Sequence, residues 1–175
     1  VRDELSNHYG EDIVPKTGNL PAHVLGNMWG QSWSNIYDLV YTPESISSSS
    51  KIDLTSILID KDIDEKEMVK IAENFFISLG FEPLSDTFWE RSLFTKPQDR
   101  NVVCHASAWD LDSDINDLRI KMCIERNAED FSVIHHELGH IFYYQAYSHL
   151  PDIFQSGAND GFHEAVGDLL TLSIT

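Results

Sequence analysis

The stretch "AEDFSVIHHELGHIFYYQAY", residues 128 to 147, has the spacing of one long helix and carries two histidines four residues apart. Residues four apart on a helix lie one turn above each other on the same face. His136 and His140 can therefore offer imidazole nitrogens to one metal ion. Glu137, next to the first of them, can then reach a water molecule instead of the metal. The stretch predicts a helix that carries two metal ligands and a general base.

A second helix downstream supplies a third ligand. In "GANDGFHEAVGDLL", residues 157 to 170, Asn159 or Asp160 can cap the helix, and Glu164 and Asp168 are four apart on one face. Glu164 can complete the ligand set, and Asp168 can hydrogen-bond the far nitrogen of a ligand histidine. The alternative is a solvated acidic face, which the apolar and small residues between the two carboxylates disfavour. Two histidines and one carboxylate favour zinc, which lowers the pKa of a bound water to roughly 7.

Two other features resemble metal ligands but receive no ligand role. His135 and His163, each adjacent to a predicted ligand, point to other faces, and we interpret them as ordinary polar or ligand-supporting residues. "DLDSDIND", from Asp110, resembles the opening of a calcium loop. Such a loop needs glycine at its sixth position and glutamate at its twelfth, and Ile115 and Lys121 stand there. This stretch is predicted to be a polar hairpin loop.

The remaining pattern is mostly helical. "NMWGQSWSNIYDLV" has an aromatic stripe at helical spacing, which we expect to pack in a core: Trp29, Trp33, Ile36, Tyr37 and Val40. The serine-rich residues 41–51 are predicted to be an exposed loop, and a short helix is expected near Asp53. Residues 62–81 have apolar positions at three-and-four spacing and end at Gly80. The runs "NVVCHASAW" and "LRIKMCI", within residues 101–124, predict one small β-hairpin in a mainly α protein.

Charge and composition exclude several partner classes. Twelve basic and 29 acidic residues give a net charge of -17, which repels nucleic acid and anionic lipid. No run of about 18 apolar residues occurs, so no membrane anchor is visible in this chain. Cys104 and Cys123 are either free thiols of a cytosolic protein or one disulfide of a secreted one, and their spacing does not decide. The chain begins like the end of a helix and ends without a helix stop, so we expect a piece of a larger protein.

Four blocks of the sequence together resemble one family. "PAHVLGNMWGQSWSNIYDLV", "VVCHASAWDL", "HHELGH" and "GANDGFHEAVGD" are similar to the angiotensin-converting enzyme family of zinc peptidyl-dipeptidases, in the same order and at closely similar spacings. The resemblance covers nearly the whole chain and is weak in the serine-rich segment. It implies that residues 1–175 are part of a large helical zinc-peptidase catalytic domain, truncated at both ends.

The resemblance implies a role for each residue of the metal motifs. His136, His140 and Glu164 would hold one zinc ion, and Asp168 would orient a ligand histidine. Glu137 would be the general base that deprotonates the attacking water and later passes the proton to the leaving amine. Chloride is a further ligand of this family, but the arginines that bind it lie outside this chain.

Substrate contacts are implied as well. His105 and the backbone of Ala106 and Ala108 would hold the substrate as an added strand, and Gln31 would help bind its C-terminal carboxylate. The implied activity is release of C-terminal dipeptides from oligopeptides that have a free C-terminus. A histidine and a tyrosine that stabilise the oxyanion would lie beyond Thr175, so the isolated fragment is expected to be poorly active.

The resemblance also implies a location. The family is extracellular, so Cys104 and Cys123 would form a disulfide in a secreted protein or in one anchored through a segment outside this chain. Two alternatives stay open. One is a different glutamate-ligand zinc peptidase, an endopeptidase or aminopeptidase that needs no Gln31 site. The other is a catalytically silent relative that acts as a binding or scaffold protein, against which the intact metal and base residues argue.

Overall fold

The computed structural model describes residues 1–26, 33–40 and 52–174. They belong to two compact units, Val1–Lys51 and Ile52–Thr175. The serine-rich segment that we predicted to be a loop lies outside the described residues. None of the helices in the described ranges combines the length and the apolar character needed to cross a membrane.

The first unit is a small cluster of short helices. Its elements are α1 (Arg2–Tyr9), η1 (Ala22–Leu25), η2 (Ser34–Ile36) and α2 (Tyr37–Val40). Its core consists of Leu5, Val14, Val24, Leu25 and Ile36. Helix α1 ends at Gly10, whose φ of 91° is a conformation that glycine adopts without strain.

The aromatic stripe predicted for this unit is only partly confirmed. Ile36 is buried, but Trp33 is 46% exposed and Tyr37 48% exposed, so the expectation that they pack in a core is wrong. The described part of the stretch is a 3₁₀ turn followed by one short α-helix. A 3₁₀ helix has about three residues per turn, so the face that a regular α-helix would have formed is lost. Trp29 lies outside the described residues.

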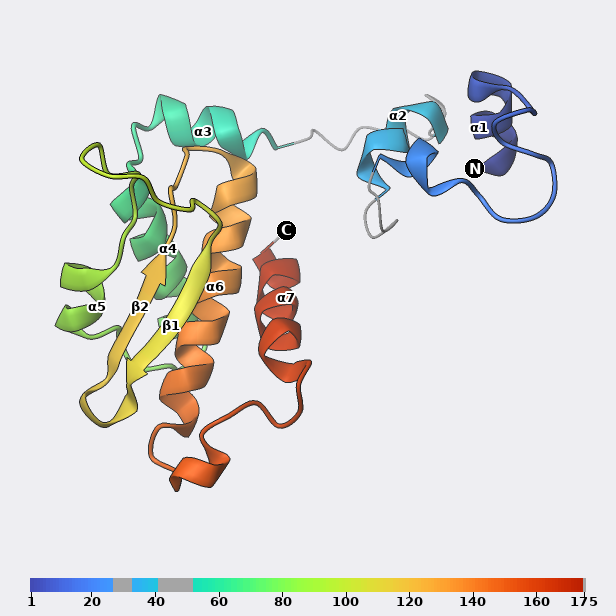
Figure 1. The fold of residues 1–175 in the computed structure, drawn as a ribbon. Helices are drawn as coiled ribbons and strands as arrows, with labels where there is room; N and C mark the ends of the chain where they lie inside the picture. The colour runs from blue at the N-terminus through green and yellow to red at the C-terminus, as the bar shows by residue number, and fades with distance from the viewer. Residues whose placement is uncertain (27–32, 41–51, 175) are drawn as a thin grey trace. The chain divides into compact units, whose positions relative to one another are not determined.

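The second unit is helical with one hairpin, as predicted. Its elements are α3 (Leu54–Asp60), α4 (Glu65–Ser78), α5 (Asp86–Arg91), β1 (Ser107–Asp112), η4 (Ser113–Ile115), β2 (Asp117–Lys121), α6 (Ala128–Tyr147), η5 (Asp152–Phe154) and α7 (Phe162–Ile174). Helix α6 runs through the middle of this unit, with the hairpin on one side and α7 alongside it (Figure 1).

Helix α6 has the bounds that the sequence predicts, and its apolar face anchors the core. The side chain of Asn127 accepts the backbone N–H of Asp130 at 2.7 Å and caps the first turn. Phe142 of α6 stacks on Phe76 of α4, with ring centroids 4.4 Å apart. The face of α6 that packs in the core consists of Ile134, Leu138, Ile141 and Phe142. This packing fixes the orientation of α6, and with it the opposite side of the helix, where His136 and His140 lie.

The hairpin lies against α6, and its first strand begins later than the sequence suggested. Ala108 pairs with Ile120 in an antiparallel register, and the pairing starts at Ser107. The end of β2 also pairs with the segment after α5: the N–H of Leu93 donates to the carbonyl of Ile120, and the N–H of Met122 donates to the carbonyl of Leu93. The stretch from Asp110 that we predicted to be a hairpin loop is only partly one, because β1 continues through Asp112 and the turn consists of η4 and Asn116.

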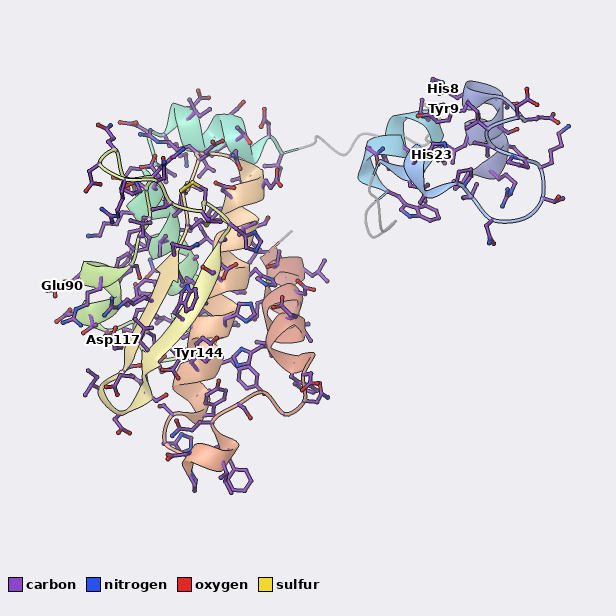
Figure 2. All side chains as sticks on the ribbon, viewed as in Figure 1. His8, Tyr9, His23, Glu90, Asp117 and Tyr144 are labelled. Carbon is purple, nitrogen blue, oxygen red and sulfur yellow. A yellow bond between two sulfur atoms is a disulfide. The ribbon has the colours of Figure 1, made fainter. Side chains whose placement is uncertain are left out.

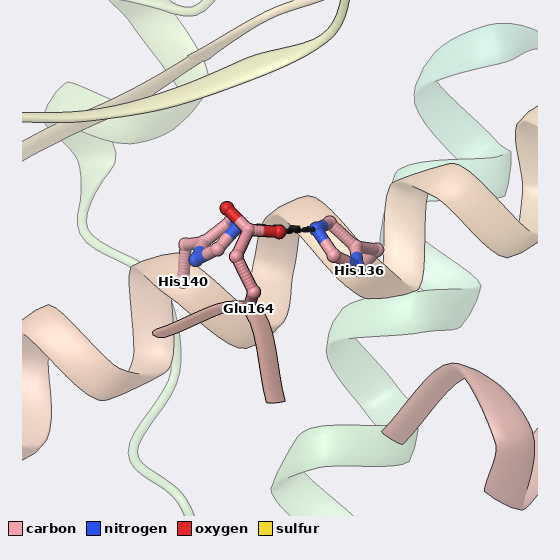
Figure 3. A group of neighbouring side chains, drawn as sticks. All are labelled: His136, His140 and Glu164. Atoms are coloured by element: carbon pink, nitrogen blue, oxygen red, sulfur yellow. Dashed lines mark hydrogen bonds and ion pairs between the residues drawn. The ribbon is translucent and has the colours of Figure 1, made fainter. Parts of the chain in front are cut away.

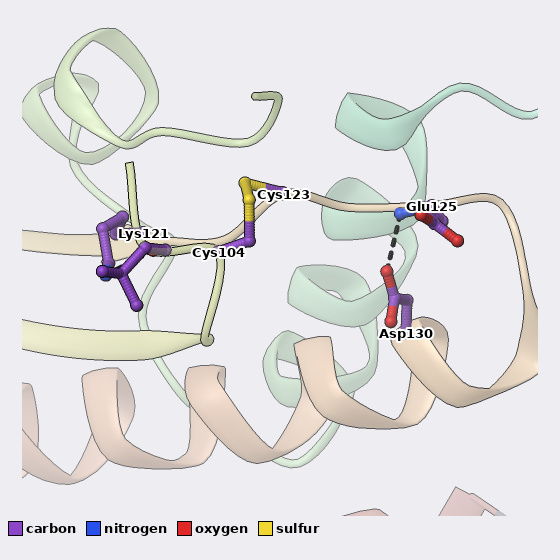
Figure 4. The surroundings of a disulfide bond; sticks show 6 residues. Cys104, Lys121, Cys123, Glu125 and Asp130 are labelled. Atoms are coloured by element: carbon purple, nitrogen blue, oxygen red, sulfur yellow. Dashed lines mark hydrogen bonds between the residues drawn. A yellow bond between two sulfur atoms is a disulfide. The ribbon is translucent and has the colours of Figure 1, made fainter. Parts of the chain in front are cut away.

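A disulfide ties the approach to β1 to the chain just after β2. Cys104 and Cys123 are bonded, which confirms the pairing that the resemblance implied (Figure 4). Beside it, the carboxylate of Asp130 accepts the backbone N–H of Glu125 at 2.6 Å, which links this segment to the first turn of α6. The separation of 19 residues corresponds to a stabilisation of roughly 3 kcal/mol in the chain-entropy account.

Candidate metal centre

Three side chains from two helices bring ligand atoms together (Figure 3). His136 and His140 come from α6 and Glu164 from the first turn of α7. His136 Nε2 lies 3.1 Å from Glu164 Oε2, and His140 Nε2 lies 3.7 Å from Glu164 Oε1. The two imidazole Nε2 atoms are 3.1 Å apart. Within the ranges that the structure describes, this is the one group of three or more such side chains placed to hold a metal ion.

The spacing of these atoms fits zinc. Donor atoms bound at roughly 2.0–2.1 Å around a tetrahedral ion lie about 3.3 Å apart, and the observed separations of 3.1, 3.1 and 3.7 Å bracket that value. Nitrogen, nitrogen and carboxylate oxygen are also the donor types that zinc prefers in hydrolytic sites. Two imidazole nitrogens and a carboxylate so close together need a proton or a cation between them. The three residues therefore fit the ion that the sequence predicted.

Two glycines allow α7 to approach α6 closely enough for this arrangement. A Cβ atom added at Gly139 would lie 2.8 Å from the Cα of Gly167. A Cβ added at Gly167 would lie 2.8 Å from Nδ1 of His136 and 3.0 Å from its carbonyl oxygen. The two distances of 2.8 Å are shorter than real Cβ atoms show, so a side chain at either glycine would require neighbouring atoms to shift. The contact sets the distance from which Glu164 reaches the histidines.

Each histidine of the group has a partner for its second nitrogen. Asp168, one turn after Glu164, lies with Oδ1 3.0 Å from Nδ1 of His136, as predicted. Nδ1 of His140 lies 3.3 Å from Nδ1 of His163. Burial lowers the pKa of His140, which favours the neutral imidazole that binds metals.

His163 in turn is held by tyrosines. Its Nε2 lies 2.9 Å from the hydroxyl of Tyr147. Burial raises the pKa of Tyr147 to about 12, so this hydroxyl keeps its proton at neutral pH. His135 is separate from the group: it is buried on another face, with Nδ1 2.8 Å from the carbonyl oxygen of Phe131. Of the two histidines that we set apart, His163 contacts a predicted ligand histidine and His135 does not.

Glu137 lies beside the group in an open cavity of about 820 Å³. The residue is only 6% exposed, and burial raises the pKa of its carboxyl group. Among its neighbours, His136 opposes this shift and Glu164 adds to it. A cation held by the three donors would lower the pKa again. Glu137 is thus a buried carboxylate that faces the same space as the ligand atoms.

The segment before and within β1 forms another wall of this cavity. His105, Ala106 and Ala108, which the resemblance identified as substrate contacts, all line it, and so do both disulfide cysteines. The structure therefore brings these residues to the same space as the histidines and Glu137. Gln31, the remaining predicted contact, lies outside the described residues.

Sequence reasoning missed two kinds of residue. Gly139 and Gly167 carry no chemistry, yet they set the helix contact; glycine inside two otherwise strong helical patterns was the available signal. The tyrosines around His163 were also missed. Tyr143, Tyr144 and Tyr147 lie at three-and-four spacing on α6, a pattern that indicates ordinary core packing and nothing about a histidine on another helix.

Comparison with known proteins agrees with the resemblance seen in the sequence. The model of the M2 peptidase family, described as angiotensin-converting enzyme, matches residues 1–175. Angiotensin-converting enzyme of Bos taurus is 51% identical over 176 residues, which covers 100% of this chain and 13% of that protein. The angiotensin-converting enzyme-related protein of Drosophila melanogaster is 45% identical over 174 residues, which covers 99% of this chain and 27% of that protein. Although it spans only these shares of its relatives, the chain belongs to the angiotensin-converting enzyme family of peptidases.

Proposed function

We propose that this chain carries the zinc centre of a peptidyl-dipeptidase, which releases dipeptides from oligopeptides with a free C-terminus. One observation carries the proposal: two histidines of α6 and a carboxylate of α7 converge at zinc-like spacing, with Glu137 facing the same cavity. Membership of the angiotensin-converting enzyme family supports the peptidase class. The single zinc ion would be held by His136, His140 and Glu164.

Zinc and two side chains of this chain would have separate roles in the reaction. Zinc would supply Lewis acidity toward the scissile carbonyl and would acidify a water that it binds. The Glu137 carboxylate takes a proton from the water as the water oxygen attacks the carbonyl carbon. It gives that proton to the amine nitrogen as the C–N bond breaks. Asp168 keeps His136 in the tautomer that leaves Nε2 free to bind the ion.

The substrate would lie along the approach to β1. An extended peptide can pair with the backbone of Ala106 and Ala108, and His105 lines the same wall. Gln31 would take part in holding the terminal carboxylate, which limits the enzyme to free C-termini. The net charge of -17 favours peptide substrates over nucleic acid.

We also propose an extracellular location for the protein, which the Cys104–Cys123 disulfide supports because disulfides persist in oxidising compartments. The protein would be secreted or held at a membrane through a segment outside this chain. Any chloride ligands would also lie outside it.

The mechanism predicts the effect of changing the base in the full-length protein. Glu137→Gln keeps the shape but cannot take a proton, so dipeptide release from a hexapeptide should fall by roughly 10²- to 10⁴-fold. Zinc content, measured by metal analysis, should stay at one ion because Glu137 is not a ligand. Glu129→Gln, an exposed glutamate of the same helix, is the matched control and should act like wild type. Undiminished release by Glu137→Gln would sink the mechanism.

A second comparison separates the proposed specificity from its alternatives. The same hexapeptide with an amidated C-terminus should be cut far more slowly, because no carboxylate is available for the Gln31 site. Equal rates for acid and amide would favour an endopeptidase or aminopeptidase. A zinc-loaded protein that cuts neither peptide would instead indicate a silent relative with a binding role.

A further inference from the structure

His163 stands between the ligand group and a set of tyrosines, and no part of the proposed mechanism uses it. It comes from α7, one residue before Glu164. Its Nδ1 faces Nδ1 of His140 at 3.3 Å, and its Nε2 faces the hydroxyl of Tyr147 at 2.9 Å. Among the described residues, His163 is therefore the group on the non-ligand nitrogen of His140, as Asp168 is for His136.

The tautomers of His140 and His163 follow from the proposed role of His140. If His140 binds the ion through Nε2, its Nδ1 carries the proton and donates it to a hydrogen bond. The acceptor at 3.3 Å is Nδ1 of His163, which must then present its lone pair. The proton of His163 consequently lies on Nε2 and points to the oxygen of Tyr147. One consistent assignment connects the ion site to Tyr147 through two imidazole rings.

Packing holds the His163 ring in this orientation. Its centroid lies 4.6 Å from the ring of Tyr143, 4.7 Å from that of Tyr144 and 5.8 Å from that of Tyr147. All three tyrosines come from the last turns of α6, the helix that also carries His140. Tyr147 is only 7% exposed, so its hydroxyl has little freedom to move away. The ring of His163 is fixed by the same helix whose ligand it contacts.

We propose that His163 is a positioning residue for His140: its Nδ1 accepts the Nδ1–H of the ligand, and Tyr147 holds it in that tautomer. The two ligand histidines are then supported differently, one by a carboxylate and the other by a neutral imidazole–phenol pair. A neutral acceptor orients the ring, but it polarises the Nδ1–H bond less than a carboxylate does and so raises the basicity of the ligand nitrogen less. The two ligands would therefore differ in basicity.

The test uses the full-length protein and measures zinc affinity by competition with a chelator, together with the visible absorption of the cobalt-substituted protein. His163→Leu removes the acceptor and should weaken zinc binding by about 10- to 100-fold and shift the cobalt bands. His163→Asn places an amide oxygen near the position of Nδ1 and should recover most of the affinity. Tyr147→Phe should give a smaller loss in the same direction. His149→Gln, an exposed histidine near the end of α6, is the control and should match wild type.

The outcomes separate this inference, which rests on the proposed zinc site, from that site itself. A wild-type protein that binds no zinc would overturn both. Wild-type zinc binding together with unchanged affinity and cobalt spectrum in His163→Leu would overturn the inference alone. So would equal losses in the leucine and asparagine variants when circular dichroism shows both to be folded. If the leucine variant does not fold, Tyr147→Phe and His163→Asn decide: a wild-type spectrum in the first and a strong loss in the second would contradict the proposal.

Discussion

Asp117, the first residue of β2, is a buried carboxylate held by two arginines. Arg119 donates to it from Nε and Nη2, each at 2.7 Å, and Arg91 of α5 donates at 3.2 Å. Figure 2 labels Asp117 on the hairpin. The hydrogen bonds from Arg119 lower the pKa of Asp117 below 3.8, and burial opposes them. The ion pairs therefore connect the hairpin to α5 through a group that favours its charged form in the folded protein.

A pH dependence of stability follows from this shift. Because the folded pKa is lower than the unfolded one, the contribution is complete above about pH 4 and is lost as the pH falls through the folded pKa. The free energy of unfolding, measured by urea titration between pH 7 and pH 3, should fall less steeply below pH 4 in Asp117→Asn than in wild type. Asp114→Asn, an exposed aspartate of the same hairpin, should keep the wild-type slope. A slope that Asp117→Asn leaves unchanged would contradict this account.

At the same scale, the sequence predicts the residues that carry chemistry better than those that arrange them. Helical spacing alone predicts that His136 and His140 share a face, and the structure places them so. The contact between Asp168 and His136 joins two helices, yet it was predictable because Asp168 is one turn from Glu164. The contact of His163 with His140 was not, because it depends on how far the two helices are rotated relative to each other. The spacing of residues along one helix gives no information about the rotation of one helix relative to another.

The contact between α6 and α7 is the element on which the ligand group depends. Gly139 and Gly167 face each other where the helices are closest. Neither glycine has a positive φ, so the requirement is for space and not for an unusual backbone. Helix α6 carries two of the proposed ligands and α7 carries the third, so a change in the separation of the helices would move Glu164 relative to the histidines.

Alanine at either glycine tests this dependence. Gly→Ala inside a helix normally stabilises by roughly 0.5–1 kcal/mol, whereas overpacking a close contact costs about 1–3 kcal/mol. We expect Gly139→Ala and Gly167→Ala to lower the thermal unfolding midpoint and to weaken zinc binding, measured by scanning calorimetry and chelator competition. Ala165→Ser adds an atom to the exposed side of α7 and should change neither. Higher stability with unchanged zinc affinity in both alanine variants would argue against a space-limited contact.

The elements themselves were predicted with uneven success. The bounds of α6 match the sequence pattern because capping by Asn127 and the apolar periodicity agree. The first strand begins later than expected, at Ser107. In addition, β2 hydrogen-bonds to Leu93 in the segment after α5, a tertiary contact that local β propensity does not reveal. The stretch with the aromatic stripe forms a 3₁₀ turn and one short α-helix in its described part, although its spacing is compatible with a single helix.

For the whole molecule, a bound ion would act as a link between parts of the second unit. Its ligands come from α6 and α7, and the surrounding cavity also includes the acidic groups of Glu137 and Asp130. In a chain of net charge -17, a divalent cation removes local repulsion among these carboxylates. A ligand that binds only the folded state stabilises it by about 4 kcal/mol at a concentration 1,000 times its Kd.

Removal of the metal should therefore lower the stability of the protein. We expect a chelator to reduce the thermal unfolding midpoint of the full-length protein, and added zinc to restore it. Glu164→Gln weakens the site, so its midpoint should respond little to the chelator, whereas Glu129→Gln should respond like wild type. An equal response in wild type and Glu164→Gln would show that the stabilising metal binds elsewhere.

The close approach of Gly139 and Gly167 also bears on which changes in the gene the protein can accept. Glycine is the only residue without a Cβ, so every missense mutation at either codon inserts at least one carbon atom into the contact. Alanine is the smallest insertion, so the loss expected for alanine is the minimum for any inherited substitution there. At these two codons the genetic code offers no conservative replacement.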